Sequence, residues 1–114
     1  MIQVYKRLKK MREKYVDTLA KLYEYATTVY SKRIYTQWYD TKEGSYTYAS
    51  FKSECDALSK KLTQYGIGSG DKVAILSQSM PNWSVAFFAT VAYGRISIPI
   101  LPDSSENEVT NIIN

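Results

Sequence analysis

Histidine and cysteine, two residue types that often act as catalytic bases, nucleophiles or metal ligands, are scarce in this sequence. The 114 residues include no histidine and a single cysteine, Cys55. Without histidine the chain holds no Ser-His-Asp or Cys-His pair and no zinc site that uses histidine. One cysteine builds neither a disulfide framework nor a cysteine metal cluster. Cys55 falls on the apolar stripe of a predicted helix, so we interpret it as a small core residue rather than a reactive thiol.

The glycines at positions 66, 68 and 70 have the spacing of a dinucleotide-binding loop. A loop that cradles phosphate follows a strand and opens a helix. Here the glycines follow a predicted helix and open a predicted strand, Lys72–Ser77. We therefore interpret Gly66 as a helix C-terminal glycine and the rest as a tight turn.

Positive charge is concentrated at the N-terminus. Residues 1–14 hold six Lys and Arg against Glu13, a net charge of +5, and because the whole chain carries +4 the other 100 residues sum to −1. Such an arm can meet nucleic acid or an anionic membrane surface, although a charge run is more commonly a solvated helix face. No apolar run approaches the length of a membrane span, and no apolar segment follows the arm as in a signal peptide. We expect a cytoplasmic protein, with peripheral membrane contact as an open alternative.

The elements that position these residues centre on a predicted βαβ unit. Two apolar strands, Lys72–Ser77 and Ile96–Ile100, flank an apolar helix over Pro81–Tyr93, and such crossovers are right-handed in nearly all cases. The helix is apolar on most sides, so we expect it to be buried on most sides. Pro99 removes a ladder donor and places the second strand at a sheet edge.

Helical periodicity precedes this unit. An apolar stripe with steps of three and four runs from Val4 to Val29 and includes Leu19, Leu22 and Ala26. It predicts one long helix or two helices broken near Asp17-Thr18. The stripe is interpreted as a face docked on the domain, with a self-association helix as the alternative.

A predicted hairpin and helix lie between the stripe and the βαβ unit. Residues 33–40 alternate and residues 45–48 return as a short antiparallel strand. Thr47 is the predicted N-cap of a helix over 48–65, whose apolar stripe comprises Phe51, Cys55, Leu58, Leu62 and Tyr65. A last helix opens after Asp103 with Ser104 or Ser105 as its cap, and we expect it to be truncated at Asn114.

Four stretches in this order resemble the N-terminal region of the AMP-forming adenylate-forming ligases, which include acyl-CoA synthetases, adenylation domains and luciferases. Residues 46–51 (YTYASF) are similar to the family's TYxEL, and 65–75 (YGIGSGDKVAI) to GvkpGDrVai. Residues 79–89 (SMPNWSVAFFA) are similar to NsPEW…AfxA, and 94–100 (GRISIPI) to GaxxvPl. The resemblance covers 46–114, with a looser fit over 15–40.

The end of the chain indicates which branch of this family the sequence resembles most. Residues 99–109 (PILPDSSENEV) resemble the PIYxTSSxExV of long-chain fatty acyl-CoA synthetases more than the PLDPxYPxERI of amino-acid-activating domains. Ser50 stands where the family usually has Glu, so we expect the helix after Thr47 to lack a capping box. Ser79 and Asn82 replace the usual Asn and Glu.

The resemblance implies an α/β fold, a partial N-terminal subdomain of an adenylate-forming ligase. It would have one β-hairpin and a βαβ parallel unit flanked by helices. Residues 1–14 are then a basic N-terminal arm. Residues 15–114 are the N-terminal portion of an AMP-binding (acyl-CoA synthetase) domain, truncated at its C-terminal end.

The resemblance also implies a chemistry for the whole enzyme. A full member joins a fatty acid carboxylate to ATP with Mg²⁺, giving acyl-AMP and pyrophosphate, and then passes the acyl group to the thiol of CoA. The family's Ser/Thr/Gly-rich loop ending in Lys, its later acidic residues and its C-terminal lysine have no counterpart here. We therefore assign no catalytic, cofactor-binding or metal-binding residue and expect the chain alone to be inactive. The matched positions Thr47, Asp71, Trp83 and Pro99 are interpreted as cap, turn and core residues.

Two other readings stay open. The chain could be a small α/β interaction module whose basic arm binds an anionic membrane or nucleic acid, although the arm offers only Tyr5 and Tyr15 for stacking on bases. It could also form a homodimer through the N-terminal helix or through an exposed half-core. For the acyl-CoA synthetase reading no nucleic acid partner is expected.

Overall fold

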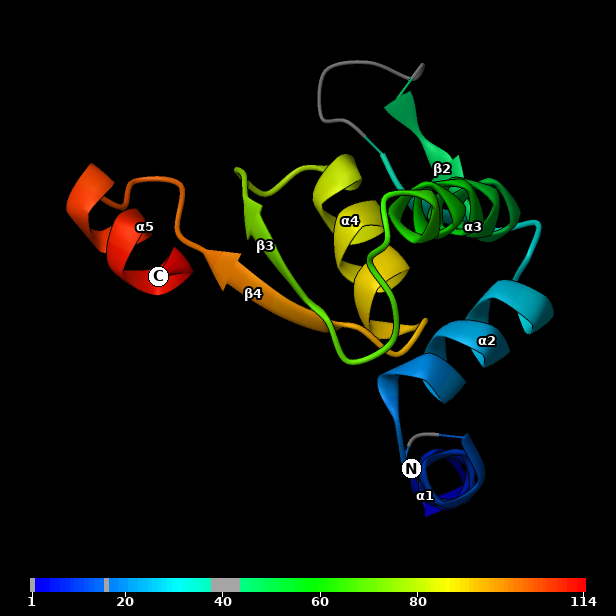
Figure 1. Cartoon of the computed structure of the whole chain (residues 1–114). Helices are drawn as coiled ribbons and strands as arrows, with labels where there is room; N and C mark the ends of the chain where they lie inside the picture. Colours follow the sequence, from blue (N-terminus) through cyan, green and yellow to red (C-terminus); the bar gives the residue numbers. More distant parts are fainter. Residues whose placement is uncertain (1, 16, 38–43) are drawn as a thin grey trace.

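The fold is described from a computed structural model, which covers residues 2–15, 17–37 and 44–114. Two helices and a hairpin precede a segment in which helices and strands alternate, and Figure 1 shows their arrangement. In chain order the elements are α1 (Ile2–Tyr15), α2 (Leu19–Val29), β1 (Ile34–Thr36), β2 (Tyr46–Thr47), α3 (Tyr48–Gln64), β3 (Lys72–Leu76), α4 (Pro81–Val91), β4 (Ile96–Ile100) and α5 (Glu106–Ile113).

The predicted βαβ unit is confirmed. Strands β3 and β4 pair in parallel, from Lys72 opposite Ile96 to Leu76 opposite Ile100. Helix α4 connects them and lies on one side of the strand pair, while α5 lies on the other side (Figure 1). Pro81 is the first residue of α4, where a missing amide hydrogen is not needed. The N-cap is Met80, whose side chain makes no capping hydrogen bond.

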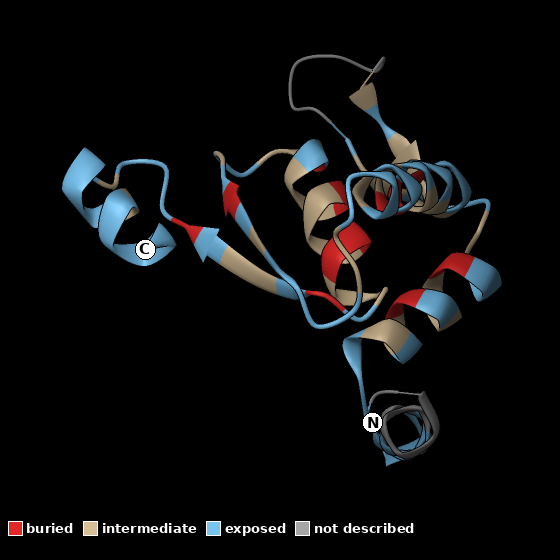
Figure 2. Ribbon diagram, viewed as in Figure 1, coloured by how far each residue is buried: buried red, intermediate tan, exposed pale blue. Residues whose placement is uncertain are grey.

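The core lies where α2, α3 and α4 meet (Figure 2). Its buried side chains are Tyr23, Phe51, Cys55, Val85 and Ala89. Aromatic rings fill most of this space. Tyr23 of α2 stacks on Phe88 of α4 with ring centroids 5.7 Å apart, and Phe51 of α3 meets Phe88 edge-on at 5.8 Å. Three helices that are distant in sequence are thus joined by contacts between rings.

Helix α3 begins as predicted, with one correction. Thr47 is its N-cap, and the Thr47 hydroxyl accepts a hydrogen bond from the Ser50 amide at 3.1 Å. The expected loss of the capping box is wrong, because the Ser50 hydroxyl accepts a hydrogen bond from the Thr47 amide at 2.9 Å. A serine at the third helical position can therefore replace the longer glutamate. Gly66 follows the helix with a φ of 82°, as a helix C-terminal glycine should.

Two predicted apolar stripes are shifted from the faces that the structure buries. The two-helix alternative holds, since α1 ends at Tyr15 and Thr18 caps α2. In α2, however, Tyr23 and Thr27 are buried, whereas Leu19 and Val29 are exposed. The reason is aromatic packing at Tyr23, together with a bond that the Thr27 hydroxyl donates to the Tyr23 carbonyl at 2.8 Å.

The stripe of α3 shows the same kind of difference. Phe51 and Cys55 are buried as predicted, but Ser59 takes the next buried position. Tyr65, the last member of the predicted stripe, is exposed at the C-cap of the helix. The Ser59 hydroxyl can be buried because it accepts a hydrogen bond from a buried arginine described below.

The hairpin and the last helix also form. β1 and β2 pair antiparallel, with Ile34 opposite Thr47 and Thr36 opposite Tyr46. The rest of the predicted first strand, residues 38–40, lies outside the described residues. Ser105, one of the two predicted caps, is the N-cap of α5 and forms a capping box with Glu108. Among the described helices, none has the length and apolar character needed to cross a bilayer.

Candidate functional site

The four residues at matched motif positions have structural roles. Thr47 caps α3, as described above. The Asp71 carboxylate accepts a hydrogen bond from the Gly68 amide at 2.7 Å and so closes the turn before β3. Trp83 stacks on Phe87 in α4 with centroids 5.1 Å apart, and Pro99 sits in β4 opposite Ile75. The predicted cap and turn are thus confirmed, whereas Trp83 is only half-buried and Pro99 is exposed, so the prediction of a core position is wrong for Pro99.

The glycine-rich turn is not arranged to hold phosphate. A phosphate loop presents several backbone amides to one anion. Here the Gly68 amide binds Asp71, and the Gly70 amide donates to the Gly94 carbonyl at 2.8 Å. Gly70 has a φ of 86°, which favours glycine. The predicted tight turn into β3 is confirmed, and its contact with the residue before β4 was not predicted.

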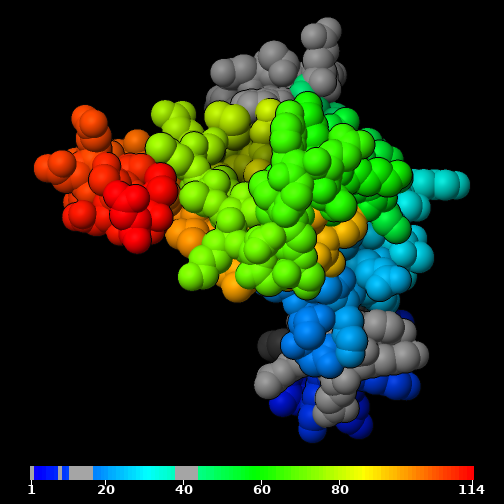
Figure 3. All heavy atoms as spheres, in the orientation of Figure 1, coloured from blue at the N-terminus to red at the C-terminus, as the bar shows by residue number. Residues whose placement is uncertain are grey.

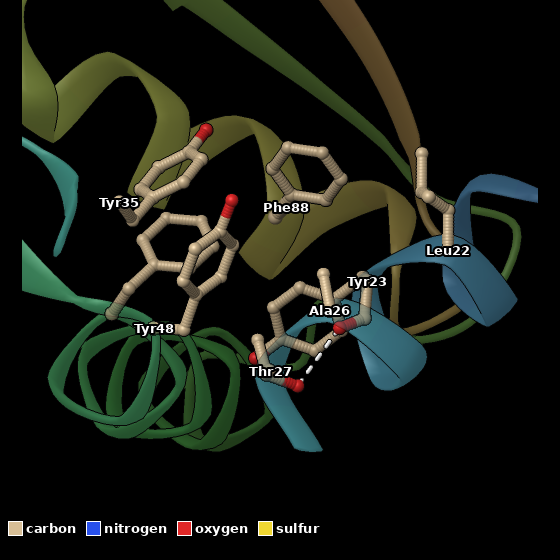
Figure 4. A pocket seen from close by; sticks show the side chains of 8 residues that line it. Leu22, Tyr23, Ala26, Thr27, Tyr35, Tyr48 and Phe88 are labelled. Atoms are coloured by element: carbon tan, nitrogen blue, oxygen red, sulfur yellow. Dashed lines mark hydrogen bonds between the residues drawn. The ribbon is translucent and has the colours of Figure 1, made fainter. Parts of the chain in front are cut away.

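An apolar cavity of about 170 Å³ opens between α2, α3, α4 and the hairpin (Figure 4). Tyr35 and Tyr48 border it from one side with Phe88 beside them, and α2 closes the other side (Figure 4). Its lining comprises Leu22, Tyr23, Ala26, Thr27, Tyr35, Tyr48, Phe51 and Phe88. An apolar cavity of about 150 Å³ can hold a benzene-sized molecule. This cavity can thus accept an uncharged ring or a short aliphatic group.

No reactive thiol borders this cavity. Cys55 lies beneath it in the core with 0% of its surface exposed, and its thiol donates to the Val85 carbonyl at 3.7 Å. Burial raises the pKa of Cys55 to about 12. The thiol is therefore protonated at neutral pH, which confirms the interpretation of Cys55 as a core residue.

The Tyr23 hydroxyl is also held in its neutral form. Burial, together with the nearby Cys55 and Asp56, raises the pKa of Tyr23 well above its ordinary value. The hydroxyl lies 3.5 Å from the Lys52 carbonyl and 3.4 Å from the Tyr93 hydroxyl, and Tyr93 in turn donates to Asp56. These contacts orient the rings of Tyr23 and Tyr93 in the core.

Arg95 is the buried charged residue that sequence reasoning missed. Its guanidinium donates to the Ser59 and Thr63 hydroxyls, both at 2.8 Å, and to the Ile67 carbonyl at 2.9 and 3.0 Å. Further bonds reach the Ser59 and Ala89 carbonyls. Ser59 and Thr63 belong to the last turns of α3, where the negative end of the helix dipole favours a cation. In the sequence, the only indication of the burial of Arg95 was its position between Gly94 and an apolar strand.

The basic face of α1 is the other concentration of charge in the described chain. Lys6, Arg7 and Lys10 line one shallow depression together with Gln3. All three basic side chains are exposed. Within residues 2–15, 17–37 and 44–114, no three His, Cys, Asp or Glu side chains gather as metal ligands would.

The sequence is similar to a known protein family and to several of its curated members. A family model described as AMP-binding enzyme matches residues 23–114. The putative acyl-CoA synthetase YngI of Bacillus subtilis is 30% identical over 103 residues, which are 90% of this chain and 19% of that protein. The medium-chain fatty-acid–CoA ligase of Escherichia coli is 31% identical over 78 residues, 66% of this chain and 13% of that protein. The chain thus spans less than one fifth of the length of these curated relatives.

Solved structures agree on the fold. The N-terminal subdomain of Klebsiella oxytoca NpsA, determined with anthranilyl-AMSN, superposes with a TM-score of 0.77 at 18% identity, over 87% of this chain and 25% of that one. IdnL1 superposes with a TM-score of 0.77 at 14% identity, over 94% of this chain and 21% of that one. At this identity the likeness shows the fold alone.

Proposed function

The chain belongs to the AMP-binding enzyme family, and on that premise we propose that it forms part of an ATP-dependent fatty acyl-CoA synthetase. The observation that carries this proposal is the 30% identity to an acyl-CoA synthetase over 90% of the chain. Two further relatives are named as a medium-chain and a long-chain fatty-acid–CoA ligase. A fatty acid is therefore the substrate class that we propose for the whole protein.

The proposed reaction has two steps. The fatty acid carboxylate attacks the α-phosphate of ATP, which gives acyl-AMP and releases pyrophosphate, with Mg²⁺ balancing phosphate charge. The thiol of CoA then attacks the acyl carbon, and AMP leaves as acyl-CoA forms. Both steps need phosphate-binding donors and a cation near the developing charge.

The part that these 114 residues play is structural. The residues at the motif positions are engaged in a helix cap, a turn, a stacked pair and a strand. Cys55 and Tyr23 are neutral and buried. We propose that the aromatic layer of α2, α3 and α4 supports the strand pair of a larger ligase domain, and that residues 1–14 form an arm outside that domain.

A pyrophosphate-release assay tests the proposal. The purified 114-residue chain is supplied with ATP, Mg²⁺, CoA and fatty acids of several lengths. We expect no release above the rate without protein. The whole protein encoded by the source gene, assayed in parallel, should release pyrophosphate only when a fatty acid is present.

Either half of the assay can overturn the proposal. Fatty-acid-dependent turnover by the 114-residue chain would mean that it holds catalytic residues, contrary to the structural role. Failure of the whole protein with every fatty acid, combined with turnover of another carboxylic acid, would reject the fatty acid as substrate.

A further inference from the structure

Helix α1 is the element that the proposed function does not use. The family model begins at residue 23, beyond the end of α1 at Tyr15. Figure 3 shows the atoms of α1 at one end of the molecule, beyond α2 and away from the strand pair. The scaffold role therefore gives no reason for the composition of this helix.

Charge on α1 is strongly biased. Lys6, Arg7, Lys9 and Lys10 are all exposed, and the segment from residue 2 to residue 12 contains no acidic residue. Residues 1–14 carry +5 while the rest of the chain sums to −1. An exposed cationic helix on a nearly neutral body is complementary to an anionic surface.

The same helix exposes apolar side chains. Ile2, Val4 and Tyr5 are 74%, 61% and 67% exposed, respectively. At 100° per residue, Tyr5 lies about 100°, 160° and 140° around the helix from Lys6, Arg7 and Lys10, so it is on the side away from the basic face. Val4 lies about 160° from Lys6 but about 60° from Arg7, so it borders the basic face. A helix with an exposed apolar side and a lysine- and arginine-rich side suits the boundary between lipid headgroups and acyl chains.

We propose that α1 binds the surface of an anionic lipid bilayer. Lys6, Arg7 and Lys10 meet the lipid phosphates and carboxylates, and Val4 and Tyr5 enter the headgroup region. Nucleic acid would satisfy the cations but offers no apolar layer for Val4. A dimer formed through the basic face of α1 would bring like charges of two copies together, which opposes association through that face.

Flotation with lipid vesicles tests this binding on the full 114-residue chain. Vesicles of dioleoyl phosphatidylcholine with 30% dioleoyl phosphatidylserine are compared with pure phosphatidylcholine at low salt, without ATP, fatty acid or CoA. Each basic residue near such a surface contributes about fivefold to partitioning. We therefore expect strong binding to the anionic vesicles, weak binding to the neutral ones, and release as NaCl is raised.

Matched charge variants locate the binding surface. The triple variant K6Q/R7Q/K10Q should partition on the order of a hundredfold more weakly into anionic vesicles. The triple variant K32Q/K60Q/K61Q removes the same charge from exposed positions outside α1 and should lose less than threefold by this argument. Equal losses in the two variants would overturn the proposal, because binding would then follow net charge alone.

A third variant and a competitor separate lipid from other partners. V4Q keeps every charge and should weaken vesicle binding several-fold if the apolar side enters the membrane. Vesicle binding that V4Q leaves unchanged, together with equal or tighter binding to duplex DNA in the same buffer, would assign α1 to nucleic acid instead. Circular dichroism of each variant confirms that the body stays folded. The assay contains no substrate, so its failure leaves the proposed ligase function standing, and failure of the ligase assay leaves this proposal standing.

Discussion

The helical layer and the strand pair of this molecule differ in how far their apolar side chains are buried. Where α2, α3 and α4 meet, Phe51, Cys55 and Ala89 are almost completely buried. In the strand pair, Leu76 of β3 and Ile96 of β4 remain 52% and 48% exposed. Figure 2 shows the same contrast, with buried residues gathered among the helices and mostly exposed or intermediate residues toward α5.

The difference comes from the number of neighbours that each layer has. In the helical layer rings from different elements meet, such as Phe51 of α3 against Tyr35 of β1 at 4.4 Å. The pair of β3 and β4 has α4 on one face, while α5 covers only part of the other, around Ala74 and Ile98. Apolar periodicity therefore identifies the face of an element that favours burial. Whether that face is buried depends on whether another element packs against it.

The sharpest test of this contrast is a pair of truncations to alanine. We expect Phe51→Ala to lower the free energy of unfolding by about 3–5 kcal/mol, because it leaves a cavity among packed rings. Leu76→Ala removes a half-exposed side chain and should cost less than about 1 kcal/mol. Urea unfolding followed by circular dichroism measures both values. Similar costs for the two variants would show that the strand pair is as well packed as the helices.

Arg95 joins the two regions, so its removal should have the second largest effect. It begins the chain segment that enters β4 and donates hydrogen bonds to Ser59 and Thr63 of α3. Arg95→Gln leaves several buried acceptors without donors, and we expect a loss of about 2–3 kcal/mol in the free energy of unfolding. Arg95→Lys keeps the charge but not the planar fork.

The lysine variant is the control for this prediction. If hydrogen-bond geometry matters, Arg95→Lys should lose at least half as much stability as Arg95→Gln in the same urea titration. A lysine variant as stable as the original chain would instead mean that charge near the end of α3 is sufficient.

Much of the fold could be predicted from the sequence because glycine and proline mark its boundaries. Gly66, Gly94 and Pro81 placed the ends of α3, α4 and the strands within about two residues of the observed bounds. The hairpin and the parallel pair also followed from alternation and apolar runs. These features depend on local backbone preferences, which a short stretch of sequence carries.

The candidate site could not be predicted in the same way. Its cavity is lined from α2, β1, α3 and α4, and no periodicity within one element shows which rings from distant segments will meet. The buried side of α2 was misplaced because a stack of Tyr23 on Phe88 outweighed the aliphatic stripe. The burial of Arg95 was missed because its acceptors Ile67, Thr63 and Ser59 lie 28, 32 and 36 residues earlier in the chain.

The stability of the helical layer should also fall at alkaline pH. The pKa of Cys55 is raised from 9.0 to about 12 by burial, so the folded state holds this proton more tightly than the unfolded state. Stability from the thiol is fully present below pH 9 and is lost as pH rises from 9 to 12, by up to about 1.4 kcal/mol per pH unit. Tyr23, whose pKa is also raised, adds a further loss above pH 10.

Cys55→Ala isolates the contribution of the thiol. Between pH 9 and 10 the variant should lose stability less steeply than the original chain, as measured by urea unfolding at each pH. Contributions that both proteins share cancel in the difference. Parallel stability curves over this range would contradict the raised pKa of Cys55.

The smallest effect on stability, and a direct probe of the open face, is expected from Leu76→Gln/Ile96→Gln. Both side chains are already half exposed, so the free energy of unfolding should change by less than about 0.5 kcal/mol. The effect on self-association should be larger than the effect on stability, because two copies could bury these side chains against each other. We expect the double variant to weaken any self-association of the chain about tenfold in sedimentation velocity experiments over a range of concentrations. Ile2→Gln/Val4→Gln on α1 is the matched control, and a larger effect of that variant would assign association to α1 instead of the strand pair.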